Sequence, residues 1–403
     1  MAGLENFISE TELEALYRPT GEARGLPAKA YVDEAFWNLE REKLFPRTWI
    51  TCAFETDVPE PGDICPVTVA GWALIVTRGQ DGAVNVFHNV CAHRAMQVVD
   101  KPCKGAISMR CPWHSWIYDL EGRLVRTPGL GGVNKHEVDG FNADELGLKR
   151  VRAGTWLGYV FINLDGKAPP LAEFVAPIEA RLEGFDLGQL RHSGITTSSE
   201  FEGNWKLAVE GGIEDYHVPW IHPAIGPHGG TFEIDFDDSG AYIGMAARRP
   251  ANRNTGNGGG IRYGGARQVG GLPLFPHLEN GGAPDDGLDD GTLLLFILPF
   301  AVIAVMPNHL VTTILVPLAH DRTQQRRVFH FIGDASLDPA LTAAREEVRD
   351  GWLSVGDEDK PLVAQVHKQH ALRAEIGMDT RFSPYWEAGV HHFQKMVVEL
   401  LRD

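Results

Sequence analysis

The segments FHNVCAHR (residues 87–94) and CPWHSWIYD (residues 111–119) each hold one cysteine and one histidine within a few residues. Cys91 and His93 form the first pair, Cys111 and His114 form the second, and seventeen residues separate the two pairs. A thiolate and an imidazole on each of two tight loops provide four metal ligands. Two kinds of site use such a set: a closed tetrahedral zinc site, and a [2Fe–2S] cluster with two Cys on one iron and two His on the other.

The mixed composition of each pair favours the iron–sulfur cluster. Zinc ligands usually come as a cysteine pair followed by a histidine pair, with like ligands together. Here each loop carries one ligand of each type, which suits a Rieske cluster held between two hairpin tips. Trp113 and Trp116 lie beside the ligands and are expected to shield the cluster. Zinc stays open as the alternative.

Together with Gly122-Arg-Leu124, these segments resemble the Rieske non-haem iron oxygenases, and most closely their large (α) subunits. The resemblance implies that the cluster is bound by Cys91, His93, Cys111 and His114. It also implies a second domain that holds a mononuclear Fe(II).

A second segment, NWKLAVEGGIEDYHVPWIHP (residues 204–223), contains the residues for such an iron site. The i, i+4, i+7 spacing of Glu210, Glu214 and His217 predicts that they share one face of a helix, which Pro219 kinks or ends. His222 could then turn back toward His217. Two imidazoles and one carboxylate form the facial triad of non-haem iron oxygenases. A di-iron site would need a second Glu-x-x-His, and only His217 has a carboxylate three residues before it.

The resemblance extends over this segment, although Gly211-Gly212 stands where the family usually has Asn and an aromatic residue. It implies that His217 and His222 bind the iron and that Asn204 and Glu214 have catalytic roles. Glu214 is expected to bridge His217 and His114 of a neighbouring subunit rather than to bind the metal.

The carboxylate ligand of the iron is expected from a late helix. Gly356-Asp-Glu-Asp359 resembles the acidic pair of the family. We therefore expect Asp359 to be the ligand, with Asp357 as the alternative.

The 403 residues are predicted to form two domains of an α+β protein. Residues 1–44 are expected to form an N-terminal segment that packs on the catalytic domain. Residues 45–165 are expected to form an all-β Rieske domain, and residues 166–403 are expected to form the catalytic domain. Helices are predicted at 171–182, 341–352, 360–372 and 385–401. Together with the predicted strands, they indicate an antiparallel sheet with helices. Residues 251–291 are predicted to form a long mobile loop. The resemblance implies that the second domain has the helix-grip (Bet v 1-like) fold.

The net charge of −17 argues against a nucleic-acid partner. The start of the chain lacks a signal-peptide pattern, no apolar run is long enough to span a membrane, and five cysteines suit a reducing compartment, so a cytoplasmic protein is expected. Residues 94–126 nevertheless carry six Lys and Arg against three acidic residues. Such a patch beside the cluster could dock an acidic redox partner.

The resemblance implies the terminal component of an oxygenase and a homotrimer (α3). A ferredoxin, a flavin reductase or both would deliver electrons from NAD(P)H. The Fe(II) would activate O2 to hydroxylate, dihydroxylate or demethylate a small organic substrate, either an aromatic compound or a quaternary amine. The alternative is a Rieske electron-transfer protein without oxygenase activity. The length of the chain and the segment 204–223 favour the oxygenase.

Overall fold

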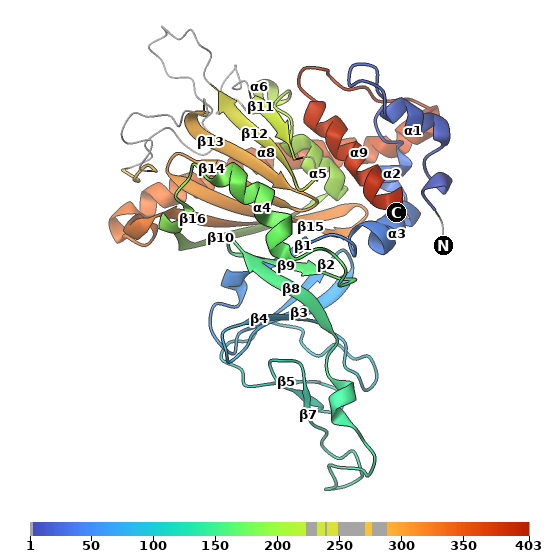
Figure 1. Cartoon of the computed structure of the whole chain (residues 1–403), viewed down its shortest axis with the longest axis vertical. Helices are drawn as coiled ribbons and strands as arrows, with labels where there is room; N and C mark the ends of the chain where they lie inside the picture. The colour runs from blue at the N-terminus through green and yellow to red at the C-terminus, as the bar shows by residue number, and fades with distance from the viewer. Residues whose placement is uncertain (1–2, 223–231, 238–239, 249–270, 276–287, 403) are drawn as a thin grey trace. The chain divides into compact units, whose positions relative to one another are not determined.

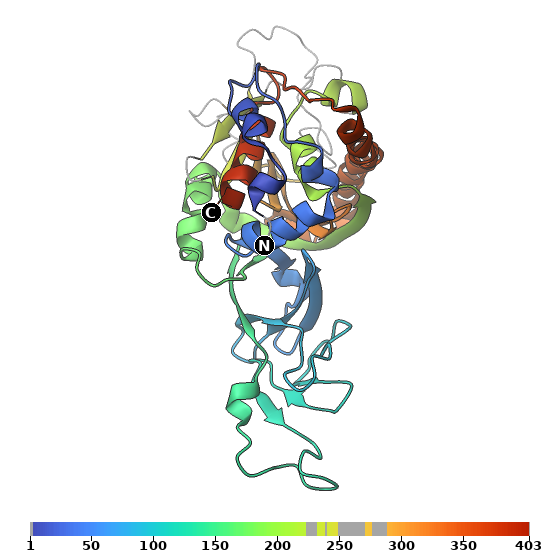
Figure 2. The same cartoon turned by 90° about the vertical axis from the view of Figure 1, so that its right-hand side faces the viewer.

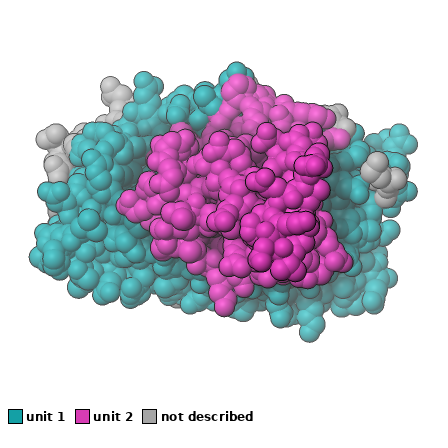
Figure 3. Space-filling view, turned by 90° about the horizontal axis from the view of Figure 1, so that it is seen from below, with its two compact units in different colours: residues 1–44, 172–403 teal, residues 45–171 magenta. Residues whose placement is uncertain are grey.

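The computed structural model describes residues 3–222, 232–237, 240–248, 271–275 and 288–402. The chain divides into two compact units, which Figure 3 colours separately. One comprises Phe45–Leu171, and the other comprises Met1–Leu44 together with Ala172–Asp403. Among the described residues, no helix combines the length and the apolar character needed to cross a bilayer.

The unit of residues 45–171 is built from antiparallel strands (Figure 1). Asp81-Gly82 forms the predicted tight turn between β3 and β4, with Gly82 at a positive φ of 81° that favours glycine. The larger sheet has the order β1 (Ile50–Phe54), β9 (Tyr159–Asn163), β8 (Arg150–Trp156), β4 (Val84–His88), β3 (Trp72–Arg78), β2 (Ile64–Val69), and the smaller has β5 (Met109–Arg110), β6 (Ile117–Tyr118), β7 (Leu124–Arg126).

The other unit contains one antiparallel sheet of seven strands. Its order is β10 (Leu190–Glu202), β16 (Arg322–Ile332), β15 (His309–Ala319), β14 (Ala301–Met306), β13 (Leu288–Ile297), β12 (Tyr242–Arg248), β11 (Phe232–Phe236). Helices α5 (Trp205–Gly212), α8 (Thr342–Ile376) and α9 (Ala388–Arg402) pack against this sheet, as Figures 1 and 2 show. A mixed unit of antiparallel sheet and helices confirms the predicted α+β class.

The remaining elements are short. The helices are α1 (Glu10–Leu16), α2 (Lys29–Val32), α3 (Glu34–Leu39), α4 (Leu171–Leu182), α6 (Val218–Ile221) and a π-helical turn η2 (Glu40–Leu44). Six 3-10 turns cover Leu4–Asn6, Glu55–Asp57, Ala143–Leu146, Leu187–Gln189, Gly333–Ser336 and Pro339–Leu341. The predicted loop at 251–291 lies largely outside the described residues, apart from 271–275 and the start of β13.

Two helix predictions were wrong. Glu214 and His217 do not share a helix face with Glu210, because α5 ends at Gly212 and α6 begins only at Val218. Glycine is a poor helix former, and Pro219 occupies the first turn of the new helix, where proline is tolerated.

The helices predicted at 341–352 and 360–372 are one helix, α8, which runs through Pro361. Its packing on α2, α5 and β10 compensates for the hydrogen bond that this proline removes.

Helix α5 is anchored to the N-terminal segment by a fully buried ion pair. Lys206 Nζ lies 2.5 Å from Glu40 Oε1, and both side chains have no exposed surface. The rings of Tyr31, Phe36 and Trp205 surround the same ammonium group at 5.2–5.6 Å. Burial raises the pKa of Glu40 and lowers that of Lys206, so each charge depends on the other.

Replacement of Lys206 by methionine should therefore destabilise this unit strongly. The substitution leaves the Glu40 carboxylate buried without its cation, which typically costs about 3–5 kcal/mol. Differential scanning calorimetry of Lys206→Met should show a lower midpoint for this unit. The double variant Glu40→Leu/Lys206→Met should recover part of the loss, and a single variant as stable as the wild type would contradict this interpretation.

Candidate metal centres and pocket

The two Cys-His loops share a pattern of backbone hydrogen bonds. The N–H of Cys91 donates to the carbonyl of Met96, and the N–H of Cys111 donates to that of Trp116, each at 2.8 Å. The N–H four residues after each cysteine donates back to the cysteine carbonyl, and this residue adopts a positive φ of 57° or 61°. The first loop follows β4, and the second joins β5 to β6.

The ligands of these loops form two separate pairs. Nδ1 of His93 and Nδ1 of His114 lie 3.1 Å apart, while both cysteines are buried. In the described part of the chain, the ligand atoms of these four side chains do not all lie within 4.8 Å of one another. A single tetrahedral zinc needs such convergence, whereas a Rieske cluster holds the histidine pair and the cysteine pair on different irons. The arrangement therefore fits the [2Fe–2S] cluster.

Aromatic side chains surround these ligands. Trp116 stacks on His93 and Trp113 stacks on His114, each with ring centroids 4.7 Å apart. The hydroxyl of Tyr118 lies 3.2 Å from Cys91 Sγ and accepts from the Ala92 N–H, so it is positioned to donate to the sulfur. Burial raises the pKa of Tyr118, which keeps the hydroxyl protonated at neutral pH. The sequence motif contained Tyr118, but only the fold reveals this contact.

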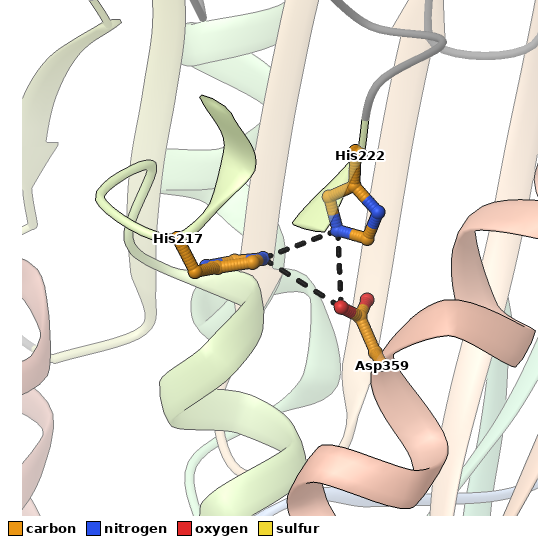
Figure 4. A group of neighbouring side chains, drawn as sticks. All are labelled: His217, His222 and Asp359. Atoms are coloured by element: carbon orange, nitrogen blue, oxygen red, sulfur yellow. Dashed lines mark hydrogen bonds and ion pairs between the residues drawn. The ribbon is translucent and has the colours of Figure 1, made fainter. Parts of the chain in front are cut away.

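The second centre brings together His217, His222 and Asp359, whose ligand atoms all lie within 4.8 Å of one another (Figure 4). The Nε2 atoms of His217 and His222 are 3.3 Å apart. Asp359 Oδ1 lies 3.0 Å from Nε2 of His222 and 3.7 Å from Nε2 of His217. These are the spacings of neighbouring ligands around one ion with bonds of about 2 Å. Three protein ligands leave positions open, as in a 2-His-1-carboxylate iron site.

Each imidazole is oriented by a carboxylate at Nδ1, the ring nitrogen that does not face Asp359. The Nδ1–H of His217 donates to Glu214, and the Nδ1–H of His222 donates to Glu358 Oε2 at 2.7 Å. Both Nε2 lone pairs are thereby directed toward Asp359. Burial lowers the pKa of each histidine, but the nearby carboxylates raise it more, so both lie above the ordinary value.

The structure distinguishes the two candidate aspartates. Asp357 lies two residues before Asp359 on α8, is 68% exposed and pairs with Lys360 at 2.7 Å. Asp359 is the carboxylate that meets the two histidines. The role of Glu358 was missed, although it stands in the same acidic run, because only the fold brings it next to His222.

Asn204 lies away from these ligands. It caps the start of α5, and its amide donates to the carbonyls of Tyr31 and His320. These contacts position the helix that precedes His217 and His222, and a catalytic role for Asn204 stays a prediction.

A cavity of about 590 Å³ opens onto the three ligands. Its walls come from α5, α8 and alternate residues of β13–β16, and most of its lining is apolar, including Leu294, Phe296 and Val302. Gly212 allows α5 to approach Phe296, because a Cβ there would lie 2.6 Å from the ring. Burial raises the pKa of Glu210 to about 7, although Tyr31 and Gln394 donate hydrogen bonds to it. The cavity is of a size typical for small-molecule sites.

Two family models match this chain. The model for the ring hydroxylating alpha subunit (catalytic domain) covers residues 189–403. The model for the Rieske [2Fe-2S] domain covers residues 48–137. The first match includes His217, His222 and Asp359, and the second includes the predicted cluster ligands Cys91, His93, Cys111 and His114.

Individual relatives agree with these models. The chain is 30% identical over 200 residues to the glycine betaine monooxygenase oxygenase subunit of Pseudomonas aeruginosa, a match that spans 50% of this chain and 45% of that relative. It is 27% identical to the anthranilate 1,2-dioxygenase large subunit of Burkholderia cepacia, over 89% of this chain and 87% of that one.

A solved structure shares the fold. The structure of a quaternary ammonium Rieske monooxygenase, reported with insights into carnitine oxidation by gut microbiota and inter-subunit electron transfer, superimposes with a TM-score of 0.75 at 20% identity. The superposition covers 96% of this chain and 98% of that one. With its catalytic half and its Rieske domain both matched, the chain belongs to the ring-hydroxylating α subunits of the Rieske non-haem iron oxygenases, which carry a Rieske [2Fe–2S] cluster and a mononuclear iron.

Proposed function

We propose that this chain is the terminal oxygenase component that inserts oxygen from O2 into a small organic substrate, or demethylates it. The observation that carries the proposal is a three-ligand centre, His217, His222 and Asp359, that faces an apolar cavity of about 590 Å³. A Rieske electron carrier has no need of this second centre or its cavity. The names of the relatives suggest a quaternary amine or an aromatic acid as the substrate.

Each residue has a distinct role in this proposal. His217, His222 and Asp359 bind the iron, which when reduced supplies the activation of O2. Glu214 and Glu358 hold the two imidazoles in the tautomer that binds metal. The apolar walls would exclude water from a substrate bound beside the three metal-binding side chains. On the other domain, Cys91, His93, Cys111 and His114 bind the cluster that stores an electron.

We further propose that electrons cross between subunits of a homotrimer, from His114 of one chain through Glu214 to His217 of the next. The inter-subunit transfer reported for the related monooxygenase supports this route. Six exposed basic residues, at positions 94, 101, 104, 110, 123 and 126, could dock a ferredoxin or reductase. The five cysteines, all in the described part of the chain, form no disulfide, which agrees with a cytoplasmic location.

Substitution of Asp359 by alanine should remove the mononuclear iron. We expect iron to fall from about three to about two per chain, since the cluster keeps its own two. Turnover should be lost while the cluster's EPR spectrum is retained. The matched control is Asp357→Ala, whose carboxylate pairs with Lys360. If Asp357→Ala loses the iron and Asp359→Ala keeps it, Asp357 rather than Asp359 is the ligand.

Glu214→Gln should stop electron transfer without emptying either centre. The amide keeps the shape and can still accept a hydrogen bond, but it lacks the charge that aligns His217. In a single turnover with substrate and O2, the pre-reduced cluster should reoxidise at least about tenfold more slowly than in the wild type. Glu358→Gln, which removes the equivalent carboxylate from His222, provides the comparison. Equal slowing in both variants would mean that Glu214 only orients its histidine.

Tyr118→Phe should lower the reduction potential of the cluster. The variant removes a hydrogen bond to Cys91 Sγ that stabilises the reduced, more negative state. One hydrogen bond of ordinary strength corresponds to a shift on the order of 40 mV for a one-electron couple. Redox titration monitored by circular dichroism measures this shift. An unchanged potential with an unchanged spectrum would rule out the hydrogen bond.

A further inference from the structure

The wall of the cavity contains one deeply buried arginine. Arg327 lies on β16 opposite Thr313 of β15, lines the cavity, and is only 6% exposed. Burial lowers its pKa to about 10, against the opposing effects of Asp359 and Asp357, so the guanidinium remains charged at neutral pH. The proposed function gives no role to this charge.

The guanidinium of Arg327 has no close acceptor in the described part of the chain, although Asp359 and Asp357 attract it through space. Among the residues that the structure describes, none accepts a hydrogen bond from the guanidinium, and no carboxylate lies within 4.0 Å of it. Gln325, two residues earlier on the same face of β16, also lines the cavity, and its side chain likewise has no hydrogen-bond partner in the described part of the chain. A guanidinium that lines a cavity without an acceptor from the protein can take its hydrogen bonds from a bound anion.

Neighbouring residues hold Arg327 in place. Its guanidinium lies 5.9 Å from the ring centre of Trp352, whose indole N–H donates to His309 Nε2 at 3.0 Å. The Nδ1–H of His309 donates in turn to Asn308 Oδ1 at 2.6 Å. Burial lowers the pKa of His309 to about 3, so this histidine stays neutral and keeps its acceptor. The arginine is thus preorganised by a buried chain of contacts.

Gly356 of α8 provides the space for the guanidinium. A Cβ at this position would lie 3.1 Å from Nη2 of Arg327 and 3.5 Å from Gln325 Oε1. Glycine inside a helix costs about 1 kcal/mol relative to alanine, so a function for this space is a reasonable expectation. Asp359 follows Gly356 by three residues, about one helical turn. The cation and the proposed iron ligand therefore lie at the same end of the cavity.

We propose that Arg327 and Gln325 bind a carboxylate of the substrate, and that the enzyme acts on organic acids. This inference rests on the proposed function. The planar guanidinium offers two parallel N–H donors to a carboxylate, and the Gln325 amide can donate a third hydrogen bond. The apolar wall formed by Leu294, Phe296 and Val302 then takes the carbon skeleton. Within the cavity, the other basic residue, Lys360, is already paired with Asp357.

The test compares acids with their uncharged amides. Calorimetric titration of the iron-loaded protein without O2 would use two pairs: benzoate with benzamide, and 4-(trimethylammonio)butanoate with its primary amide. The wild type should bind at least one acid about 10- to 100-fold more tightly than its amide, the range for a hydrogen bond to a charged group. The pair that shows the preference identifies an aromatic acid or a quaternary amine acid as the substrate type.

Arg327→Met should abolish this preference, and Arg327→Lys should keep part of it, because lysine retains the charge without the bidentate geometry. The matched control is Arg326→Met, which removes the same charge from the adjacent residue of β16, on the opposite face. It should retain the wild-type preference. Arg327→Met should also melt no lower than the wild type, since it removes a buried charge that has no hydrogen-bond acceptor among the described residues.

A wild type that prefers neither acid, or an Arg327→Met variant that retains the preference, would overturn the proposal. A lower melting temperature for Arg327→Met would make the arginine a structural residue and would also contradict it. Iron content measured on the same samples separates this outcome from failure of the proposed function. If the protein lacks the mononuclear iron and still binds the acid more tightly than the amide, the carboxylate site is supported and the proposed oxygenase function is contradicted.

Discussion

The catalytic unit depends on the direction of two imidazole lone pairs. His217 and His222 can meet Asp359 at one point only because Glu214 and Glu358 hold their Nδ1–H groups from behind. Three of these residues come from the turns around α6 and the others from α8, so the two helical segments must be fixed relative to each other. The buried pair of Glu40 and Lys206 fixes α5, which leads into that turn. A charge pair remote from the ligands thereby helps to set the geometry of the site.

Buried charge is concentrated around the cavity, although its walls are mostly apolar. Carboxylates gather at the metal end, where a divalent cation neutralises them and where they raise the pKa of the histidines. Protons therefore compete with metal for the imidazoles, and acid should weaken iron binding. Arg327 is the opposite case, a cation that donates no hydrogen bond to the described residues, although Asp359 and Asp357 attract it. Together these charges agree with the proposed substrate, an organic acid with an apolar body.

Local features could be predicted from the sequence, and features that depend on long-range packing could not. The cluster ligands lie within two short segments, so their spacing was sufficient to predict them. His217, His222 and Asp359 were also predicted, but the helix expected to carry Glu214 and His217 ends at Gly212. Glu358 and Arg327 were missed, because their roles arise from the packing of α8 against β16 and the α6 turn. A charged residue on a strand otherwise suggests solvent, and only tertiary contacts reveal that Arg327 faces a cavity.

The central claim is that one chain holds two different iron centres, and Mössbauer spectroscopy of the 57Fe-enriched, reduced protein tests it most directly. The account predicts about two irons per chain in a Rieske cluster with one localised ferrous site, and about one further high-spin ferrous iron. Asp359→Ala should lose only the latter component. A spectrum of the cluster alone in the fully loaded wild type, or zinc in place of the cluster, would contradict the account.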